Sequence, residues 1–347
     1  MILFVIGLLV SIFEKGNEKV QKNQIDSRNQ LFNMANDQEK DIKLEGLFQL
    51  IGKTTNDVKD ELGDPDRIDP SLYEYNWWIY NDHHKKYVQV GIEKDRVVTL
   101  YVMGEKLNIK PFYIGQPILD IRNSYFIPSI LEIEHQGQEF QFELSEEDIN
   151  IRPIIQIGHI YVQLYMDKYT GTLSSIRMMD VPTLLDLKPF DYREEYMEPS
   201  VERVEINDSI EKALQTQIFD LSNILRERYH VKTLKWNDEL VSEAYVRFSE
   251  LYDDDSQIST DKDLALEQEK GKDQTNERQH LLYFSEGENV AVHALDAPAI
   301  VEGWFNSKVH RENMLNQEFK ETGIVLYKDY LIQKFSPVNE EKSHSSF

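Results

Sequence analysis

The sequence predicts an α+β protein with two domains, and three observations support this prediction. The chain has 347 residues, which exceeds the length of one average domain. Residues 44–180 contain an internal repeat with strand-like runs, whereas an amphipathic helical pattern begins at Ser209. Hydrophobic residues make up 40% of the chain and aromatic residues 11%, a composition that supplies packed cores and excludes a wholly disordered protein.

Charge and cysteine content exclude several functional classes. Lys and Arg number 38 against 62 Asp and Glu, so the formal net charge is −24. A chain this acidic repels phosphate backbones and anionic lipid surfaces, and we therefore expect no nucleic-acid partner. The chain contains no cysteine, which removes disulfides, thiolate metal sites and cysteine nucleophiles.

The N-terminus begins with an apolar run at residues 1–13, followed by a polar tether at 14–43 that is rich in Lys, Glu, Gln and Asn. A membrane-spanning helix needs about 18 to 20 apolar residues, so the run is short for a span and has the length of a signal-peptide core. A buried helix or strand is the alternative, but a core element does not normally sit at the end of a polar tether. We expect an export signal or uncleaved anchor, an extracytoplasmic location, and membrane contact only through this segment.

An internal repeat organises residues 44–180. Three features of the first copy return 63 residues later: Ile51-Gly52 at Ile114-Gly115, Asp57-Val58 at Asp120-Ile121, and Pro65 at Pro128. Each copy therefore predicts a short helix, and in the first copy Thr54 or Thr55 can cap the helix before Gly63 ends it.

Strands are expected after each of these helices. Aromatic and β-branched runs predict strands at 73–80, 86–93 and 97–102 in the first copy. In the second copy, residues 161–164 echo residues 87–90 at an offset of 74, so about eleven extra residues lie before this strand. We expect two tandem units, each a helix on an antiparallel sheet.

Two groups of side chains in the repeat region invite a functional interpretation. The aromatic residues of the 73–80 run could form a ligand platform, but such a run is more often one buried strand face, and we favour a core role. His83-His84 could bind a metal, but no carboxylate or third histidine follows at ligand spacing, and we favour a solvated loop.

Residues 181–208 have the composition of a linker. They carry Pro182, Pro189 and Pro199 among acidic residues, and proline breaks helices while charge opposes burial. The linker separates the repeat region from a second domain at 209–336, which is followed by a tail at 337–347.

From Ser209 onward the pattern changes to helices followed by strands. Apolar residues recur at three- and four-residue steps from Ile210 to Leu225, and a second helix is predicted at 238–251. Residues 322–325 and 330–335 are strand-like. Five motifs follow one another in this region: Asn223-x-x-Arg226, Leu234-x-Trp236, Gly287-Glu288-Asn289, Trp304-x-x-Ser307-x-x-His310-Arg311-x-Asn313-x-Leu315 and Gln333-x-Phe335.

This order of motifs resembles the CAP superfamily (cysteine-rich secretory proteins, antigen 5 and pathogenesis-related 1 proteins) in its Cys-poor bacterial, SCP-like form. Residues 44–180 resemble the CAP-associated N-terminal domain, found in membrane-anchored or secreted proteins of low-GC Gram-positive bacteria. The resemblance implies a three-layer α-β-α sandwich for 209–336, with a cleft lined by two histidines and acidic residues. Carried over residue by residue, it makes Glu288 and His310 the candidate catalytic or metal-binding residues. A divalent metal between two imidazoles is the one cofactor that the resemblance implies.

The chain departs from the family pattern at the other cleft histidine. That residue should lie between the second helix and Gly287, but this interval has no histidine until His280, a weak metal candidate only eight residues before Glu288. The second family glutamate is replaced by Ser307. Each candidate also has a structural interpretation, in which Glu288 fastens a loop and His310 holds the start of a helix.

Three functional classes compete, and the sequence leaves open whether the protein is an enzyme. The leading hypothesis is an extracytoplasmic binding module that holds an unidentified ligand or cell-envelope partner. The alternative is a hydrolase with Glu288 or His310 as general base, with or without a metal. A third is a scaffold with an inert cleft. The missing histidine weighs against catalysis, and no serine has an evident base partner.

Overall fold

The computed structural model describes residues 44–194, 205–253, 280–282, 287–292, 296–327 and 330–337. The expected signal or anchor at 1–13, the tether at 14–43 and nearly all of the tail at 337–347 lie outside these ranges. None of the helices in the described ranges is long and apolar enough to cross a bilayer.

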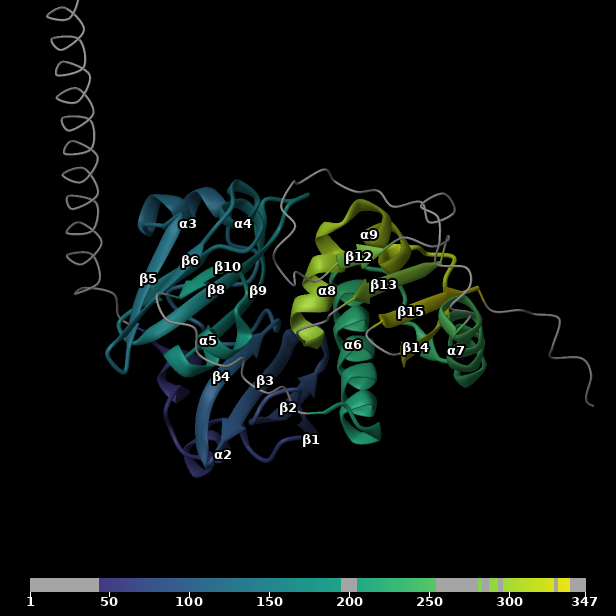
Figure 1. Cartoon of the computed structure of the whole chain (residues 1–347), viewed down its shortest axis with the longest axis horizontal. Helices are drawn as coiled ribbons and strands as arrows, with labels where there is room; N and C mark the ends of the chain where they lie inside the picture. Colours follow the sequence, from purple (N-terminus) through teal and green to yellow (C-terminus); the bar gives the residue numbers. More distant parts are fainter. Residues whose placement is uncertain are drawn as a thin grey trace, which may run out of the picture.

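A seven-stranded antiparallel sheet forms the centre of the N-terminal domain (Figure 1). Its strand order is β1-β2-β3-β4-β9-β8-β7. The strands are β1 (Arg67–Pro70), β2 (Asn76–Asp82), β3 (Lys86–Glu93), β4 (Arg96–Val102), β7 (Ile154–Ile157), β8 (Ile160–Asp167) and β9 (Thr172–Met179). The three strands predicted in the first repeat are therefore present as β2, β3 and β4.

Both repeats contribute to this one sheet, whereas the sequence predicts a separate sheet for each. The two copies meet where β4 pairs with β9. Pairing between strands far apart in the sequence leaves no local pattern, so the residues give no sign of it. Each copy also has a register shift at the same place, at Gly91/Ile92 in β3 and at Tyr165/Met166 in β8.

The pairing of β4 with β9 relates the two copies by a local two-fold axis. Val88 lies opposite Val102 in the first copy, and its counterpart Val162 lies opposite Met178 in the second. Strands β4 and β9 are therefore equivalent at an offset of 76 residues. Tyr101 and Arg177 are 76 residues apart and are paired with each other, so they lie at the axis.

Helices from both repeats cover one face of the sheet. They are the 3-10 helix η1 (Gly46–Leu50) and the α-helices α2 (Thr55–Leu62) and α3 (Ile118–Ser124). A capping box begins α2, in which the Thr54 side chain accepts from the Asp57 amide and the Asp57 carboxylate accepts from the Thr54 amide. Val58 of α2 and Ile121 of α3 are fully buried in the core of this face, at positions 63 residues apart.

An insertion within the second copy and the segment that follows this copy form a small sheet and further helices. The sheet has the order β10-β6-β5, and the elements are β5 (Ile130–His135), β6 (Gln138–Glu143), α4 (Glu146–Ile151), α5 (Val181–Leu187) and β10 (Asp191–Glu194). Residues 181–194 thus form α5 and β10, where the sequence predicts a linker. Pro182 is compatible with α5 because it lies in the first turn, where no amide partner is lost, and Asp180 caps this helix by accepting from the Thr183 amide.

The C-terminal domain has the three-layer α-β-α arrangement that the family resemblance implies. Its sheet has the order β11-β14-β15-β13-β12. The elements are α6 (Asp208–Arg228), β11 (Lys235–Trp236), α7 (Asp238–Asp253), β12 (His280–Leu282), β13 (Glu288–Val292), α8 (Ala297–Asn306), α9 (Lys308–Leu315), β14 (Glu321–Tyr327) and β15 (Tyr330–Ser336). Helix α7 packs against β14 and β15 on one face, while α6, α8 and α9 form the opposite layer (Figure 1).

The layer of α6, α8 and α9 lies between the two large sheets (Figure 1). One continuous hydrophobic cluster joins the N-terminal sheet to these helices, and it includes Tyr75 and Trp77 of the aromatic run together with Ile300 and Trp304 of α8. The core interpretation of the aromatic run is therefore confirmed. Burial of this shared apolar surface fixes how the domains sit on each other.

Candidate functional site

The motif Gly287-Glu288-Asn289 lies at the start of β13, beside α9. Gly287 has φ +82°, and a Cβ at this position would approach the Phe335 carbonyl oxygen to 3.2 Å, so glycine is required there. The Asn289 side chain donates to the His310 carbonyl at 3.2 Å, and the Asn313 side chain donates to the Glu288 carbonyl at 3.1 Å. These amides join the backbone segments that carry the two candidate residues.

Glu288 is buried with 2% exposure, and its carboxylate accepts a hydrogen bond from the guanidinium of Arg247. Arg247 belongs to α7 and follows Leu240 and Ala244, both buried, at seven and three residues. An arginine on the buried stripe of an amphipathic helix is the sequence signal that could have identified this partner. The guanidinium contacts one of the two carboxylate oxygens, and this contact would have to open for that oxygen to act as a general base.

His310 is the third residue of α9 and is 3% exposed. Its Nδ1 lies 2.7 Å from the hydroxyl oxygen of Ser307, and its ring stacks on Trp304 with centroids 6.5 Å apart. Ser307, which stands where the family has a glutamate, therefore orients the imidazole. The contact with Ser307 holds the start of α9 and also fixes the orientation of the His310 ring. The structural and the functional interpretations of His310 are therefore compatible.

The described residues do not fit a divalent metal at this site. His280 pairs with Val292 at the far end of β13, four residues along the strand from Glu288. Across the described ranges, no group of three His, Asp or Glu side chains is placed to hold an ion. His293, Asp254 and Asp255 lie outside these ranges.

Asn223 and Arg226 of the first motif have structural roles. The Asn223 side chain donates to the Leu234 carbonyl at 3.2 Å and accepts from the Leu234 amide at 2.7 Å. Arg226 is fully buried and donates to four carbonyl oxygens, those of Lys232, Met314, Asn316 and Phe319. Both residues therefore stabilise the loops around α9 rather than act on a ligand.

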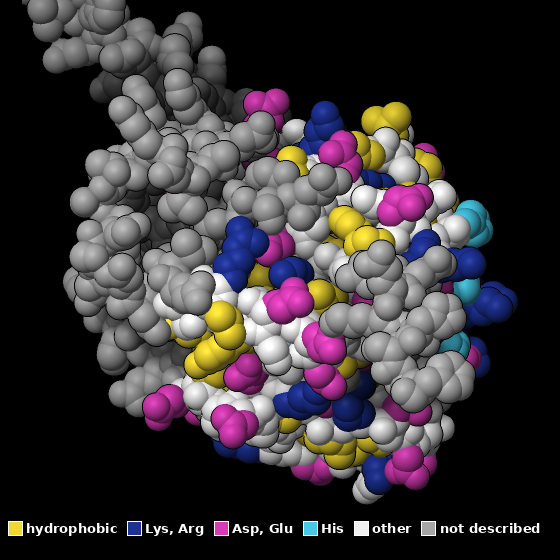
Figure 2. All heavy atoms as spheres, turned by 90° about the vertical axis from the view of Figure 1, so that its right-hand side faces the viewer, with side chains coloured by type: hydrophobic (Ala, Val, Ile, Leu, Met, Phe, Trp, Pro, Cys, Tyr) yellow, Lys and Arg dark blue, Asp and Glu magenta, His cyan; other side chains and the backbone are white. Residues whose placement is uncertain are grey.

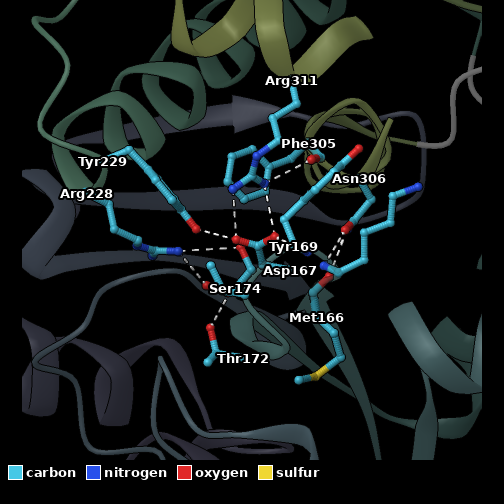
Figure 3. Close-up of polar contacts among 12 residues, drawn as sticks. Met166, Asp167, Tyr169, Thr172, Ser174, Arg228, Tyr229, Phe305, Asn306 and Arg311 are labelled. Carbon is cyan, nitrogen blue, oxygen red and sulfur yellow. Dashed lines mark hydrogen bonds and ion pairs between the residues drawn. The ribbon is translucent and has the colours of Figure 1, made fainter. Parts of the chain in front are cut away.

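A second polar cluster, centred on Asp167, joins the two domains and was not predicted from the sequence (Figure 3). Asp167 at the end of β8 accepts from both terminal nitrogens of Arg311, at 3.1 and 2.9 Å, and from the Tyr229 hydroxyl. The guanidinium of Arg311 lies over the rings of Phe305, Tyr169 and Tyr229, with its centre 3.8 to 4.9 Å from the ring centroids. Arg311 follows His310 directly, so this cluster attaches the N-terminal domain to α9, the helix that carries His310.

On the face seen in Figure 2, basic and acidic side chains intermix over the described surface. Two ion pairs, Arg247–Glu288 and Lys334–Glu243, connect α7 to the sheet. An exposed ion pair contributes little to folding stability on its own. The pair with Glu288 differs, because the Glu288 side chain is buried, with 2% exposure.

Comparisons with known proteins give the same assignment for both domains. The CAP-associated N-terminal family matches residues 51–190, and the cysteine-rich secretory protein family matches residues 219–336. A curated relative from Bacillus subtilis (strain 168), described as "Uncharacterized membrane protein YlbC", is 35% identical over 339 residues and covers 96% of each chain. The chain belongs to the CAP family.

Two solved structures support the same fold over both domains of this CAP protein. An extracellular protein containing an SCP domain from Bacillus anthracis has 27% identity and a TM-score of 0.70, and the match covers 85% of this chain and 96% of that one. A cysteine-rich secretory protein from Staphylococcus aureus has 26% identity and a TM-score of 0.68, over 84% of this chain and 94% of that one. The order of a CAP-associated domain followed by a CAP domain is therefore shared with these proteins.

Proposed function

We propose that this CAP protein is an extracytoplasmic binding protein that holds a ligand or cell-envelope partner through the region around Glu288 and His310 and through its N-terminal domain. The observation that carries the proposal is the contact between the buried Glu288 carboxylate and Arg247. A guanidinium engaged with the carboxylate suits a fixed recognition surface and opposes proton abstraction.

The extracytoplasmic location rests on the apolar run at 1–13 and on the descriptions of two relatives. One of these is described as a membrane protein and the other as an extracellular protein. Digestion of intact cells by external protease tests the location, with a cytoplasmic enzyme as the internal control. Degradation of the CAP protein with survival of the control supports the proposal, and equal protection of both refutes it.

Binding is tested by sedimentation of the full chain with isolated Gram-positive cell walls. We expect the wild type to sediment with the walls and Glu288→Gln to lose most of this binding, because the neutral amide weakens the contact with Arg247. Glu312→Gln is the matched control, since it removes a negative charge from an exposed position of α9. Circular dichroism confirms that each variant is folded. Equal sedimentation of Glu288→Gln and the control would contradict the assignment of the site.

The same assay addresses the hydrolase alternative. Soluble wall fragments released by the wild type but not by Glu288→Gln would show that Glu288 acts in hydrolysis and would replace the binding proposal. Calorimetric titration with zinc adds an independent readout. With two candidate ligands at most in the described residues, we expect no tight stoichiometric binding.

A further inference from the structure

Glu302 of α8 is a buried carboxyl group at the contact between the two domains. It is 2% exposed and lies in the helix layer that faces the N-terminal sheet. Ser175 and Ser174 of β9 donate to its Oε1, the latter at 3.3 Å, and the Tyr101 hydroxyl of β4 donates to the same oxygen at 3.0 Å. Among the described residues, all its hydrogen-bond donors thus come from the other domain, on the two strands that meet at the local two-fold axis.

The second oxygen of Glu302 has no hydrogen-bond partner among the described residues. A buried carboxylate that is half-satisfied carries a large desolvation penalty, which protonation removes. Burial accordingly raises the pKa of Glu302 to about 7, although the hydrogen bonds from Ser175 and Tyr101 oppose this shift. The carboxyl group therefore changes its charge near neutral pH while it stays at the interface.

The groups that face Glu302 from neighbouring elements do not neutralise its charge by direct contact. Arg228 of α6 acts on it only at longer range, because its guanidinium donates to the Met103 and Ser174 carbonyls and pairs with Glu105. Tyr165 of β8 also lies within electrostatic range. Arg177, a buried cation of the same interface, is paired with Asp296 at the N-cap of α8.

Helix α8 continues directly into α9, which carries His310. Asn306 at the end of α8 donates to the Met166 carbonyl at 2.9 Å and accepts from the Lys168 amide at 2.9 Å. Ser307, the next residue, contacts the His310 ring. Movement of α8 away from the sheet would therefore displace the residues that orient His310.

We propose that Glu302 is a proton-operated latch that holds the α8–α9 corner on the N-terminal sheet when its carboxyl group is neutral and loosens this contact when it ionises. The latch itself does not depend on the proposed function, whereas its consequence for ligand binding at His310 rests on that function. The sign follows from linkage: a carboxyl group that holds its proton more tightly in the closed state favours that state at low pH.

Another titratable contact crosses the same interface and must be separated from the latch. His83 and His84 of the 3-10 helix η2 (His83–Lys85) contact the carboxylate of Glu227 in α6, at 3.3 and 3.0 Å. The expected loop at His83-His84 thus has a carboxylate partner that is 143 residues away in the sequence. Only the pH response that a Glu302 variant removes therefore belongs to Glu302.

The test is hydrogen–deuterium exchange of the full chain in detergent micelles between pH 5 and pH 8, corrected for the intrinsic pH dependence of exchange. We expect the opening constant of amides in α8 and α9 to rise on the order of 70-fold in the wild type over this range. Amides of β3, which are bonded within the sheet, are the internal reference. A flat response in the wild type would overturn the latch.

Two variants assign the response to Glu302. Glu302→Gln should make the opening constant of α8 nearly independent of pH, while the exposed Glu312→Gln keeps the wild-type response. Ser175→Ala removes one donor to the carboxylate and should move the midpoint of the response to higher pH, which gives a second readout if Glu302→Gln fails to fold. A response that Glu302→Gln and Ser175→Ala leave unchanged would assign it to other groups and refute the proposal. If the latch responds as expected while cell-wall binding does not vary with pH, the latch stands and its coupling to the binding site fails.

Discussion

The buried pair between Arg177 of β9 and Asp296 of α8 allows the contact between the domains to be tested quantitatively. Its side chains are 1% and 4% exposed, and the guanidinium lies 2.6 Å from the carboxylate. Arg177 also donates to the Tyr75 hydroxyl at 2.9 Å and lies over the Trp77 ring. Asp296 caps α8 by accepting from the Ala299 amide. The substitution Arg177→Met replaces the guanidinium side chain with an apolar one of similar length and so removes the charge.

The expected cost follows from the charge that remains. Arg177→Met leaves the Asp296 carboxylate buried without its cation, and breaking a buried pair in this way costs about 3–5 kcal/mol of folding free energy. The double variant Arg177→Met/Asp296→Asn removes both charges, and its asparagine can still cap α8. We therefore expect the double variant to recover at least about 2 kcal/mol relative to the single variant.

Equilibrium unfolding in urea, followed by circular dichroism, measures these differences. Arg96→Met serves as the matched control, because Arg96 is exposed at the start of β4 and should change the free energy by less than about 1 kcal/mol. A loss below about 1 kcal/mol for Arg177→Met, or a double variant less stable than the single one, would refute the account of the pair as a buried charge contact.

Further predictions concern stability and metal binding. Between pH 5 and pH 8 the unfolding free energy of the wild type should fall by about 2.5 kcal/mol relative to that of Glu302→Gln. The reason is that the pKa of Glu302 is about 7 in the folded state and 4.5 in the unfolded state, so this group favours folding only while it is protonated. Parallel pH curves for the two proteins would contradict this. Arg226→Leu should cost roughly 3–5 kcal/mol in urea unfolding, because four backbone carbonyls lose the donor that a fully buried side chain supplies. Gly323→Ala should lower stability by about 1–3 kcal/mol, because its Cβ would come within 2.5 Å of the Val241 amide nitrogen in α7; an unchanged unfolding midpoint would be inconsistent with this packing. Zinc calorimetry should show no tight site, and tight binding that His310→Ala abolishes would contradict that expectation.

Local patterns in the sequence predict most of the individual elements. The run at 86–93 is β3 itself, and the stripe from Ile210 to Leu225 lies within α6, because hydrophobic periodicity reports which face of an element is buried. The repeat at an offset of 63 places α2 and α3 correctly. Residues 181–187 were misassigned because proline was interpreted as a helix breaker, although it is compatible with the first turn of α5.

The site was less predictable because its decisive contacts join residues far apart in the sequence. The motif identifies Glu288 and His310, yet Arg247 lies 41 residues before Glu288 and reaches it only through the packing of α7 on the sheet. The hydrogen-bond donors to Glu302 and the carboxylate partner of Arg311, Asp167, lie in the other domain, more than 100 residues away. A single sequence carries no record of such pairings.

The local two-fold axis between β4 and β9 indicates how this domain originated. Equivalent strands that pair edge to edge about a two-fold axis have the relation of subunits in an isologous dimer. A single repeat would end in an open strand edge, which another copy of itself could close, and duplication followed by fusion would make that closure permanent. After such a fusion the two copies no longer need to have the same amino-acid sequence. Tyr101 and Arg177 occupy equivalent positions in the two copies, yet one is a phenol that contacts Glu302 in the middle of α8 and the other is a cation that contacts Asp296 at the N-cap of the same helix.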